Sequence, residues 1–160
     1  MHLVYDLAEL QTLIAQSPQD WRPLVFTNGC FDLIHVGHVR YLAAAKALGK
    51  TLVVGVNSDT SVQQLKGNTR PYVPEAQRAE VLAALKSVDA VVIFSEVTAV
   101  AIIEAIAPDI YVKGGDYTPD TLPETPAVKA CGASLELIKV EIPTSTTKIV
   151  QKILNNSQSL

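Results

Sequence analysis

The sequence has no long basic run, no extended apolar run and only two cysteines, and each of these absences excludes a class of protein. Its formal net charge is −3 at pH 7, so it lacks the excess of lysine and arginine that non-specific nucleic-acid binding requires. No apolar stretch approaches the ~18–20 residues that cross a bilayer, and Asp6 and Glu9 interrupt the N-terminal segment where a signal peptide would be apolar. We therefore expect a cytoplasmic protein that binds neither nucleic acid nor membranes.

The two cysteines, Cys30 and Cys131, have no paired spacing, which argues against a disulfide framework and against a zinc site. What the sequence does contain is a globular composition, with 48% apolar and 18% charged residues in a chain of 160. A chain of this length is long enough to enclose a core and is typical of one domain. We predict a single domain over residues 1–160, with an N-terminal helix at about 5–16 and a core at about 22–155.

Short runs rich in β-branched residues alternate with longer stretches rich in Ala, Leu, Lys and Glu. The runs predict strands at 23–27, 51–57, 90–94, 109–113 and 135–140. The intervening stretches predict helices at 37–48, 74–87, 97–107 and 124–131, and two further helices at 7–15 and 145–154 are expected to pack on the outside. Because the strands are apolar throughout rather than alternating, both faces of the sheet are expected to be covered. The pattern predicts a doubly wound α/β domain with a parallel sheet of about five strands.

Polar segments follow four of these strands, and in a parallel sheet they would meet at one edge. They are TNGCFD after the first strand, NSDTS after the second, KGGDY after the fourth and PTSTTK after the fifth. This arrangement predicts a ligand site at the carboxyl ends of the strands.

The first of these segments continues into His35-Val36-Gly37-His38, so that a strand leads into a helix whose first turn contains two histidines. The N-terminus of a helix attracts phosphate through its free N–H groups and its dipole, and histidines at that position can donate hydrogen bonds to phosphate oxygens. Gly37 would let a ligand approach the backbone closely. Two unrelated surface histidines are the plainer interpretation, and the preceding TNGCFD makes it the weaker one.

The segment G-x-F-D-x-x-H-x-G-H, read from Gly29 to His38, resembles the signature of the cytidylyltransferase-like nucleotidyltransferases. The resemblance covers the chain from about Phe26 to Leu154 and implies a Rossmann-like fold. Within that superfamily the chain looks closest to the heptose 1-phosphate adenylyltransferase domain. The segments that say so are TNGCFDLIHVGH, VNSD at 56–59, LKGNTRP at 65–71, VKGGDY at 112–117 and STT at 145–147.

The resemblance also implies roles for individual residues, matched motif by motif. His35, His38 and Lys66 are expected to be catalytic, with the histidines on the triphosphate and Lys66 in a loop closing over the phosphates. The residues expected to bind the nucleotide are Cys30, Phe31, Gly37, Lys113, Asp116, Ser145, Thr146 and Thr147. The residues expected to bind the acceptor are Asp32, Arg70 and Arg78. Each role has a structural alternative. Lys66 could be a solvated loop lysine, the glycines after Lys113 could form a plain Gly-Gly turn, one of the hydroxyls could be a helix N-cap, and Arg78 could form an exposed pair with Glu75.

The resemblance implies an enzyme that transfers AMP from ATP to a sugar 1-phosphate, with Mg²⁺ bound through the ATP phosphates and no metal site in the protein. D-glycero-β-D-manno-heptose 1-phosphate is the expected acceptor, a separate kinase would supply it, and we expect a homodimer. Glu141-Ile142-Pro143 departs from the acidic residue and glycine that the family commonly has before its S-T-T hydroxyls. Three alternatives remain: a glycerol-3-phosphate cytidylyltransferase, a nucleotidyltransferase that acts on a cofactor precursor, and a non-catalytic nucleotide-binding domain.

Overall fold

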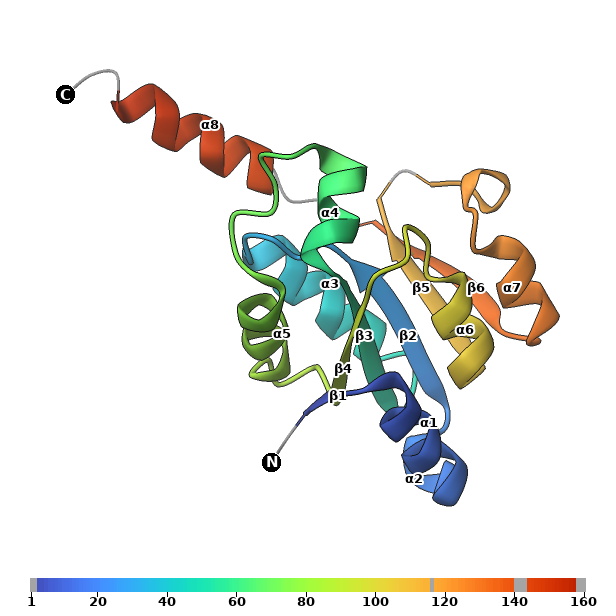
Figure 1. The fold of residues 1–160 in the computed structure, drawn as a ribbon. Coiled ribbons are helices and arrows are strands. Elements are labelled where there is room, and N and C mark those ends of the chain that lie inside the picture. The colour runs from blue at the N-terminus through green and yellow to red at the C-terminus, as the bar shows by residue number, and fades with distance from the viewer. Residues whose placement is uncertain (1–2, 116, 140–143, 158–160) are drawn as a thin grey trace.

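A computed structural model describes residues 3–115, 117–139 and 144–157, and a parallel β-sheet forms its centre (Figure 1). The six strands lie in the order β1-β4-β3-β2-β5-β6, and every neighbouring pair is parallel. They are β1 (Val4–Tyr5), β2 (Leu24–Gly29), β3 (Thr51–Asn57), β4 (Ala90–Phe94), β5 (Ile110–Gly114) and β6 (Ser134–Ile138). The predicted α/β class with a Rossmann-like parallel sheet is confirmed.

Strand β2 lies in the middle of the sheet, between β3 and β5. From β2 the chain winds outward through β3 to β4, and then crosses back to β5 and winds outward to β6. The direction of winding therefore reverses between β2 and β5. A doubly wound sheet binds its ligands at such a reversal, beyond the carboxyl ends of the strands.

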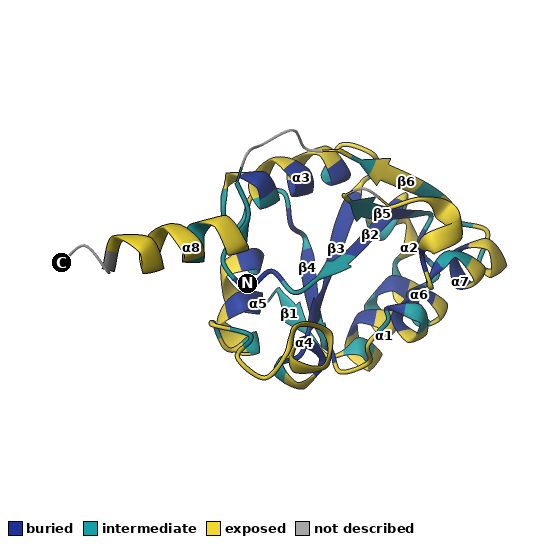
Figure 2. Ribbon diagram, turned by 90° about the horizontal axis from the view of Figure 1, so that it is seen from above, coloured by how far each residue is buried: buried dark blue, intermediate teal, exposed yellow. Residues whose placement is uncertain are grey.

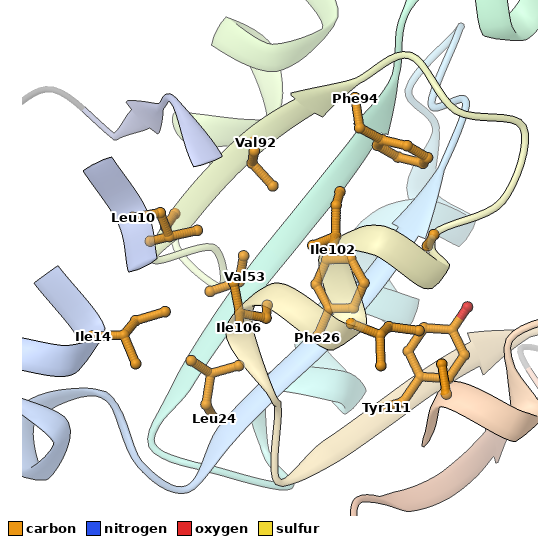
Figure 3. Packing of buried hydrophobic residues seen from close by; sticks show 14 of the residues in the cluster. Leu10, Ile14, Leu24, Phe26, Val53, Val92, Phe94, Ile102, Ile106 and Tyr111 are labelled. Atoms are coloured by element: carbon orange, nitrogen blue, oxygen red, sulfur yellow. The ribbon is translucent and has the colours of Figure 1, made fainter. Parts of the chain in front are cut away.

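Helices cover both faces of the sheet, as the apolar strands predicted. Helices α3 (Val36–Lys46) and α5 (Glu75–Ala83) pack on one face, and α1 (Leu7–Gln16), α6 (Val100–Ile106) and α7 (Thr125–Ala130) pack on the other. Strand β3 is buried along its whole length. Successive side chains of β2 point to opposite faces, so that Leu24 and Phe26 pack among α1 and α6 (Figure 3), whereas Val25 joins the cluster under α3 and α5.

Several elements differ from the expectations. Strand β1 was not predicted, because two residues are too short for a periodic pattern; it extends the sheet by pairing with β4. Helix α4 (Asp59–Lys66) occupies part of the segment around Lys66 that lacks helical periodicity. It buries only Ser61 and Val62, and the Ser58 side chain caps it by accepting a hydrogen bond from the Ser61 N–H. The short elements α2 (Pro18–Trp21) and η1 (Pro119–Thr121) were also not predicted.

The C-terminal helix α8 (Thr146–Ser157) projects away from the sheet instead of packing on its outside (Figure 2). Its side chains Ile153 and Leu154 are 60% and 56% exposed. Within the described residues, no helix combines the length and apolar character that a membrane span requires.

Candidate active site

A cavity of about 750 Å³ opens at the carboxyl ends of the strands, at the reversal between β2 and β5. A volume of this size is typical of small-molecule sites. The residues predicted from the sequence that line it are Cys30, Phe31, Asp32, His35, Gly37, His38, Lys66, Arg70, Lys113, Ser145, Thr146 and Thr147. The fold thus brings together residues from segments that lie far apart in the sequence. Asp116 lies outside the described residues, as do Glu141, Ile142 and Pro143.

The two histidines are held by backbone amides at the start of α3. His35 is the N-cap residue, and its Nδ1 accepts a hydrogen bond from the Gly37 N–H at 3.1 Å. The Nδ1 of His38 accepts from the His35 N–H at 3.4 Å. Because a backbone N–H can only donate, each Nδ1 is unprotonated, and the proton of each neutral ring is on Nε2. Both histidines therefore offer an Nε2–H donor.

The environment keeps both rings neutral near pH 7. Burial lowers the pKa of His35, and burial together with the neighbouring His35 lowers the pKa of His38 to about 4. Phe31 contributes to this environment, since its ring meets the His38 ring edge-on at 5.5 Å between centroids. The site thus presents two neutral donors beside a helix N-terminus, an arrangement suited to phosphate oxygens.

Gly37 is required by the position of the His35 ring. A Cβ atom at Gly37 would lie 2.8 Å from Cε1 and 2.9 Å from Nδ1 of His35, closer than unbonded atoms pack. The sequence suggested that this glycine admits the ligand. The structure shows that the missing Cβ atom leaves room for the imidazole ring of His35.

Asp32 and Arg70 fasten the loop that follows α4. The Oδ2 of Asp32 accepts a hydrogen bond from Arg70 Nε at 2.6 Å, and its Oδ1 accepts from the N–H groups of Tyr72 and Val73. The guanidinium of Arg70 also lies over the Tyr72 ring, 4.6 Å from its centroid. Asp32 is nearly fully buried. Both of its oxygens are therefore already used to hold the loop in place.

Arg78 does not occupy the place expected of an acceptor-binding residue or of an exposed ion pair. Its side chain is fully buried, although it lies on the first turns of α5. The guanidinium donates to the backbone carbonyls of Val73 and Cys30 and to the Asp59 carboxylate. It therefore joins three segments that surround the cavity, and we revise its expected role from substrate contact to support of the site.

Lys113 lies in a half-buried polar group at the ends of β2 and β5. The Oδ1 of Asn28 accepts hydrogen bonds from Tyr111 Oη at 2.7 Å and from Lys113 Nζ at 3.0 Å. Burial lowers the pKa of Lys113, while Glu124 and Cys30 act in the opposite direction. Burial also raises the pKa of the Cys30 thiol. Lys113 thus brings an amine to the cavity wall, where its Nζ donates to Asn28 Oδ1 and, at 3.3 Å, to Tyr111 Oη.

The hydroxyls at the start of α8 have different surroundings. Ser145 Oγ accepts a hydrogen bond from the Lys148 N–H, which makes Ser145 the helix cap. Thr146 Oγ1 donates to the Leu33 carbonyl at 3.4 Å and ties α8 to the segment before α3. Lys66 reaches the cavity from the last turn of α4, and not from a loop as predicted.

Several cavity residues were not predicted to have a role, among them Asn28, Tyr41, Asn57, Thr98 and Glu124. Asn28 is the last residue but one of β2 and Asn57 is the last residue of β3. Both lie in the quoted polar segments, so the argument from strand ends could have found them. Nothing in the sequence around Glu124 indicates a site. The part of the chain that the structure describes contains no group of three or more His, Cys, Asp or Glu side chains that would hold a metal ion.

A family model described as cytidylyltransferase-like matches residues 26–156. The protein named bifunctional protein HldE from Syntrophotalea carbinolica is 51% identical over 84% of this chain, and its namesake from Geotalea uraniireducens is 47% identical over 96%. The chain spans only 27% and 31% of the lengths of these two relatives.

Solved structures with a similar fold include a lipopolysaccharide core biosynthesis protein from Thermoplasma volcanium. It is 27% identical, with a TM-score of 0.59 over 75% of this chain and 97% of the other. A pantoate-β-alanine ligase from Francisella tularensis, 14% identical, aligns with a TM-score of 0.61 over 100% of this chain and 79% of the other.

Proposed function

The chain belongs to the cytidylyltransferase-like family of nucleotidyltransferases, and we propose that it transfers AMP from ATP to a sugar 1-phosphate. The proposed acceptor is D-glycero-β-D-manno-heptose 1-phosphate, and the products are ADP-heptose and pyrophosphate. The observation that carries the proposal is the pair of neutral histidines, each with an Nε2–H donor, at the start of α3. The resemblance of the motifs to heptose 1-phosphate adenylyltransferase domains supports the choice of acceptor.

The reaction needs no strong base in the protein. A phosphate oxygen of the sugar 1-phosphate, already anionic at neutral pH, attacks the α-phosphorus of ATP. One P–O bond forms there as the bond to the β-phosphate bridging oxygen breaks, and pyrophosphate leaves with the electron pair. Catalysis then depends on alignment and on stabilising the negative charge that develops on the phosphate oxygens.

His35 and His38 supply that stabilisation in the proposed mechanism. Their Nε2–H groups donate to oxygens of the α- and β-phosphates while Nδ1 stays on a backbone amide, so the rings do not turn during the reaction. The positive end of the α3 helix dipole attracts the same oxygens. Neutral donors suit this task, since they need neither gain nor lose a proton.

Other cavity residues complete the phosphate site. Lys66 brings a positive charge from the end of α4, and Ser145, Thr146 and Thr147 bring hydroxyls from the start of α8. Enzymes of this family use a nucleoside triphosphate together with a divalent metal ion. We propose Mg²⁺, held by the ATP phosphates, whose charge would offset that of the departing pyrophosphate.

An assay of pyrophosphate release tests the function. ATP and CTP are each combined with D-glycero-β-D-manno-heptose 1-phosphate, glycerol 3-phosphate and 4′-phosphopantetheine. We expect turnover with ATP and the heptose phosphate, with CTP a poor substitute. Preference for CTP with glycerol 3-phosphate would replace the proposal by the cytidylyltransferase alternative, and no release with any pair would indicate a binding domain.

A further inference from the structure

Glu124 contributes a buried carboxylate to the cavity wall, and one of its oxygens has no hydrogen-bond partner among the residues that the structure describes. The residue is 3% exposed and lines the cavity. Its Oε1 accepts a hydrogen bond from the Ala99 N–H at 3.2 Å, just before α6, whereas Oε2 is buried and has no partner within residues 3–115, 117–139 and 144–157. A carboxylate has about four acceptor positions. Leaving an oxygen of a carboxylate buried without a donor costs free energy, so such an atom requires an explanation.

Glu124 lies away from the two histidines and from the start of α8, and among the cations of the cavity its charge acts on Lys113, whose pKa is lowered by burial and raised by Glu124. His35 and His38 begin α3, and Thr146 at the start of α8 is tied to Leu33 just before them. Glu124 instead belongs to the opposite face of the sheet, where it joins the start of α7 to the start of α6. An anionic side chain would repel phosphates and is better placed beside an uncharged part of the bound substrates.

The chemistry of a carboxylate restricts what that part can be. A carboxylate only accepts hydrogen bonds, which suits hydroxyl groups, since each of them can donate one. The hydrogen-bonding edge of adenine presents a donor next to an acceptor, so a carboxylate facing it would gain one hydrogen bond and meet one repulsion. Thr98, which precedes Ala99, also lines the cavity, and its hydroxyl suits the same hydroxyl groups.

We propose that Glu124 binds a hydroxyl group of the acceptor sugar and thereby selects the acceptor. The inference rests on the proposed function and adds a specificity-determining residue to it. A sugar phosphate carries hydroxyls on most of its carbons, whereas the ribose of ATP carries two. Because Oε2 is buried, the carboxylate has to turn about the Cγ–Cδ bond for Oε2 to reach the hydroxyl. Torsions of this type have broad minima, so the carboxylate can turn while Oε1 continues to accept the hydrogen bond from the Ala99 N–H.

Steady-state kinetics of Glu124→Gln test the inference. The amide keeps the shape of the side chain and an oxygen for the Ala99 N–H, but removes the charge and one acceptor. We expect the KM for the sugar phosphate to rise about tenfold or more, and the KM for ATP to stay within about twofold, because only the acceptor loses a hydrogen bond. Glu104→Gln, an exposed glutamate on α6, is the matched control and is expected to leave both values unchanged.

Deoxy analogues locate the hydroxyl. Monodeoxy sugar phosphates and 2′- and 3′-deoxy-ATP are compared in the wild type and in Glu124→Gln. One deoxy sugar phosphate is expected to raise the KM of the wild type and to leave that of the variant unchanged, the signature of a direct pair. If the variant does not fold, Glu124→Asp, which keeps the charge on a shorter side chain, is used in its place and is expected to raise the same KM.

Two results would overturn the inference. One is a raised KM for ATP in Glu124→Gln with the KM for the sugar phosphate unchanged, together with a deoxy-ATP that raises the KM of the wild type but not that of the variant. This result would assign the hydroxyl to the nucleotide. The other is a variant whose KM values are both unchanged. The wild type separates these results from a failure of the proposed function: no pyrophosphate from the wild type with any sugar phosphate contradicts the function itself.

Discussion

The imidazole rings of His35 and His38 lie 4.0 Å apart between centroids, inclined by 30°, with each Nδ1 turned to a backbone amide. This arrangement fixes the tautomer of both rings before any ligand binds. The two Nε2–H donors are therefore oriented before the reaction, and no reorganisation of the rings is needed in the transition state.

Replacing either histidine should abolish most of the activity and leave the fold intact. We expect His35→Ala or His38→Ala to lower kcat by about 10²–10³-fold, because each removes a donor to charge that develops in the transition state. Both residues lie at the cavity, so the far-UV circular dichroism should be unchanged. Wild-type rates in both variants would contradict the proposed mechanism.

Gly37→Ala should impair activity through the position of His35. The added Cβ would lie 2.8 Å from Cε1 of His35, so the ring has to move, and we expect kcat/KM to fall by about tenfold or more. In His35→Ala the ring is absent, and the same glycine change is expected to cost little more. A cycle of the two single variants and the double variant measures this coupling; purely additive effects would refute the explanation.

The stability of the protein should depend on pH through His38. Its pKa is about 4 in the folded state against an ordinary value of 6.5, so the unfolded chain binds a proton more readily. The contribution of the neutral ring to stability is therefore fully present above pH 6.5 and is lost as the pH falls from 6.5 to about 4. Thermal unfolding across this range should show a smaller loss of Tm for His38→Gln than for the wild type. Equal losses would show that another group controls this range.

Arg78→Met should destabilise the fold. Methionine keeps much of the side-chain volume but leaves the Asp59 carboxylate and two carbonyls without their donor, and we expect a loss of about 3 kcal/mol in the free energy of unfolding. Urea denaturation measures it. Arg40→Met, at an exposed position of α3, is the control and should be nearly neutral. A kinetic defect without loss of stability would return Arg78 to a direct role in binding.

Lys66→Ala should reduce activity without affecting stability, because the side chain is exposed at the end of α4 and lines the cavity. We expect kcat/KM to fall by about tenfold to a hundredfold, from the loss of one charge opposite the phosphates. Lys129→Ala, an exposed lysine on α7, provides the matched control. Unchanged kinetics would make Lys66 an ordinary surface lysine.

The sequence by itself determined the features that depend on neighbouring residues. The histidines and Gly37 follow one another at a strand-to-helix junction, so a local pattern specified both their position at the helix start and their proximity. The strand predicted at 51–57 coincides with β3, because continuous apolar runs predict buried strands directly. The order of strands and helices fixed the fold class and the edge of the sheet where the site lies.

Only the tertiary structure decided the features that join residues distant in the sequence. Arg78 is attached to the Cys30 carbonyl 48 residues away, and Glu124 to the Ala99 N–H 25 residues away. No periodicity marks such pairs, because a hydrogen bond between remote segments leaves no pattern in either one. Arginine and glutamate are most often exposed in folded proteins, so their residue types pointed to the surface. Folding buried both side chains, and that burial turned one into a support of the site and left the other with an oxygen for a substrate to bind.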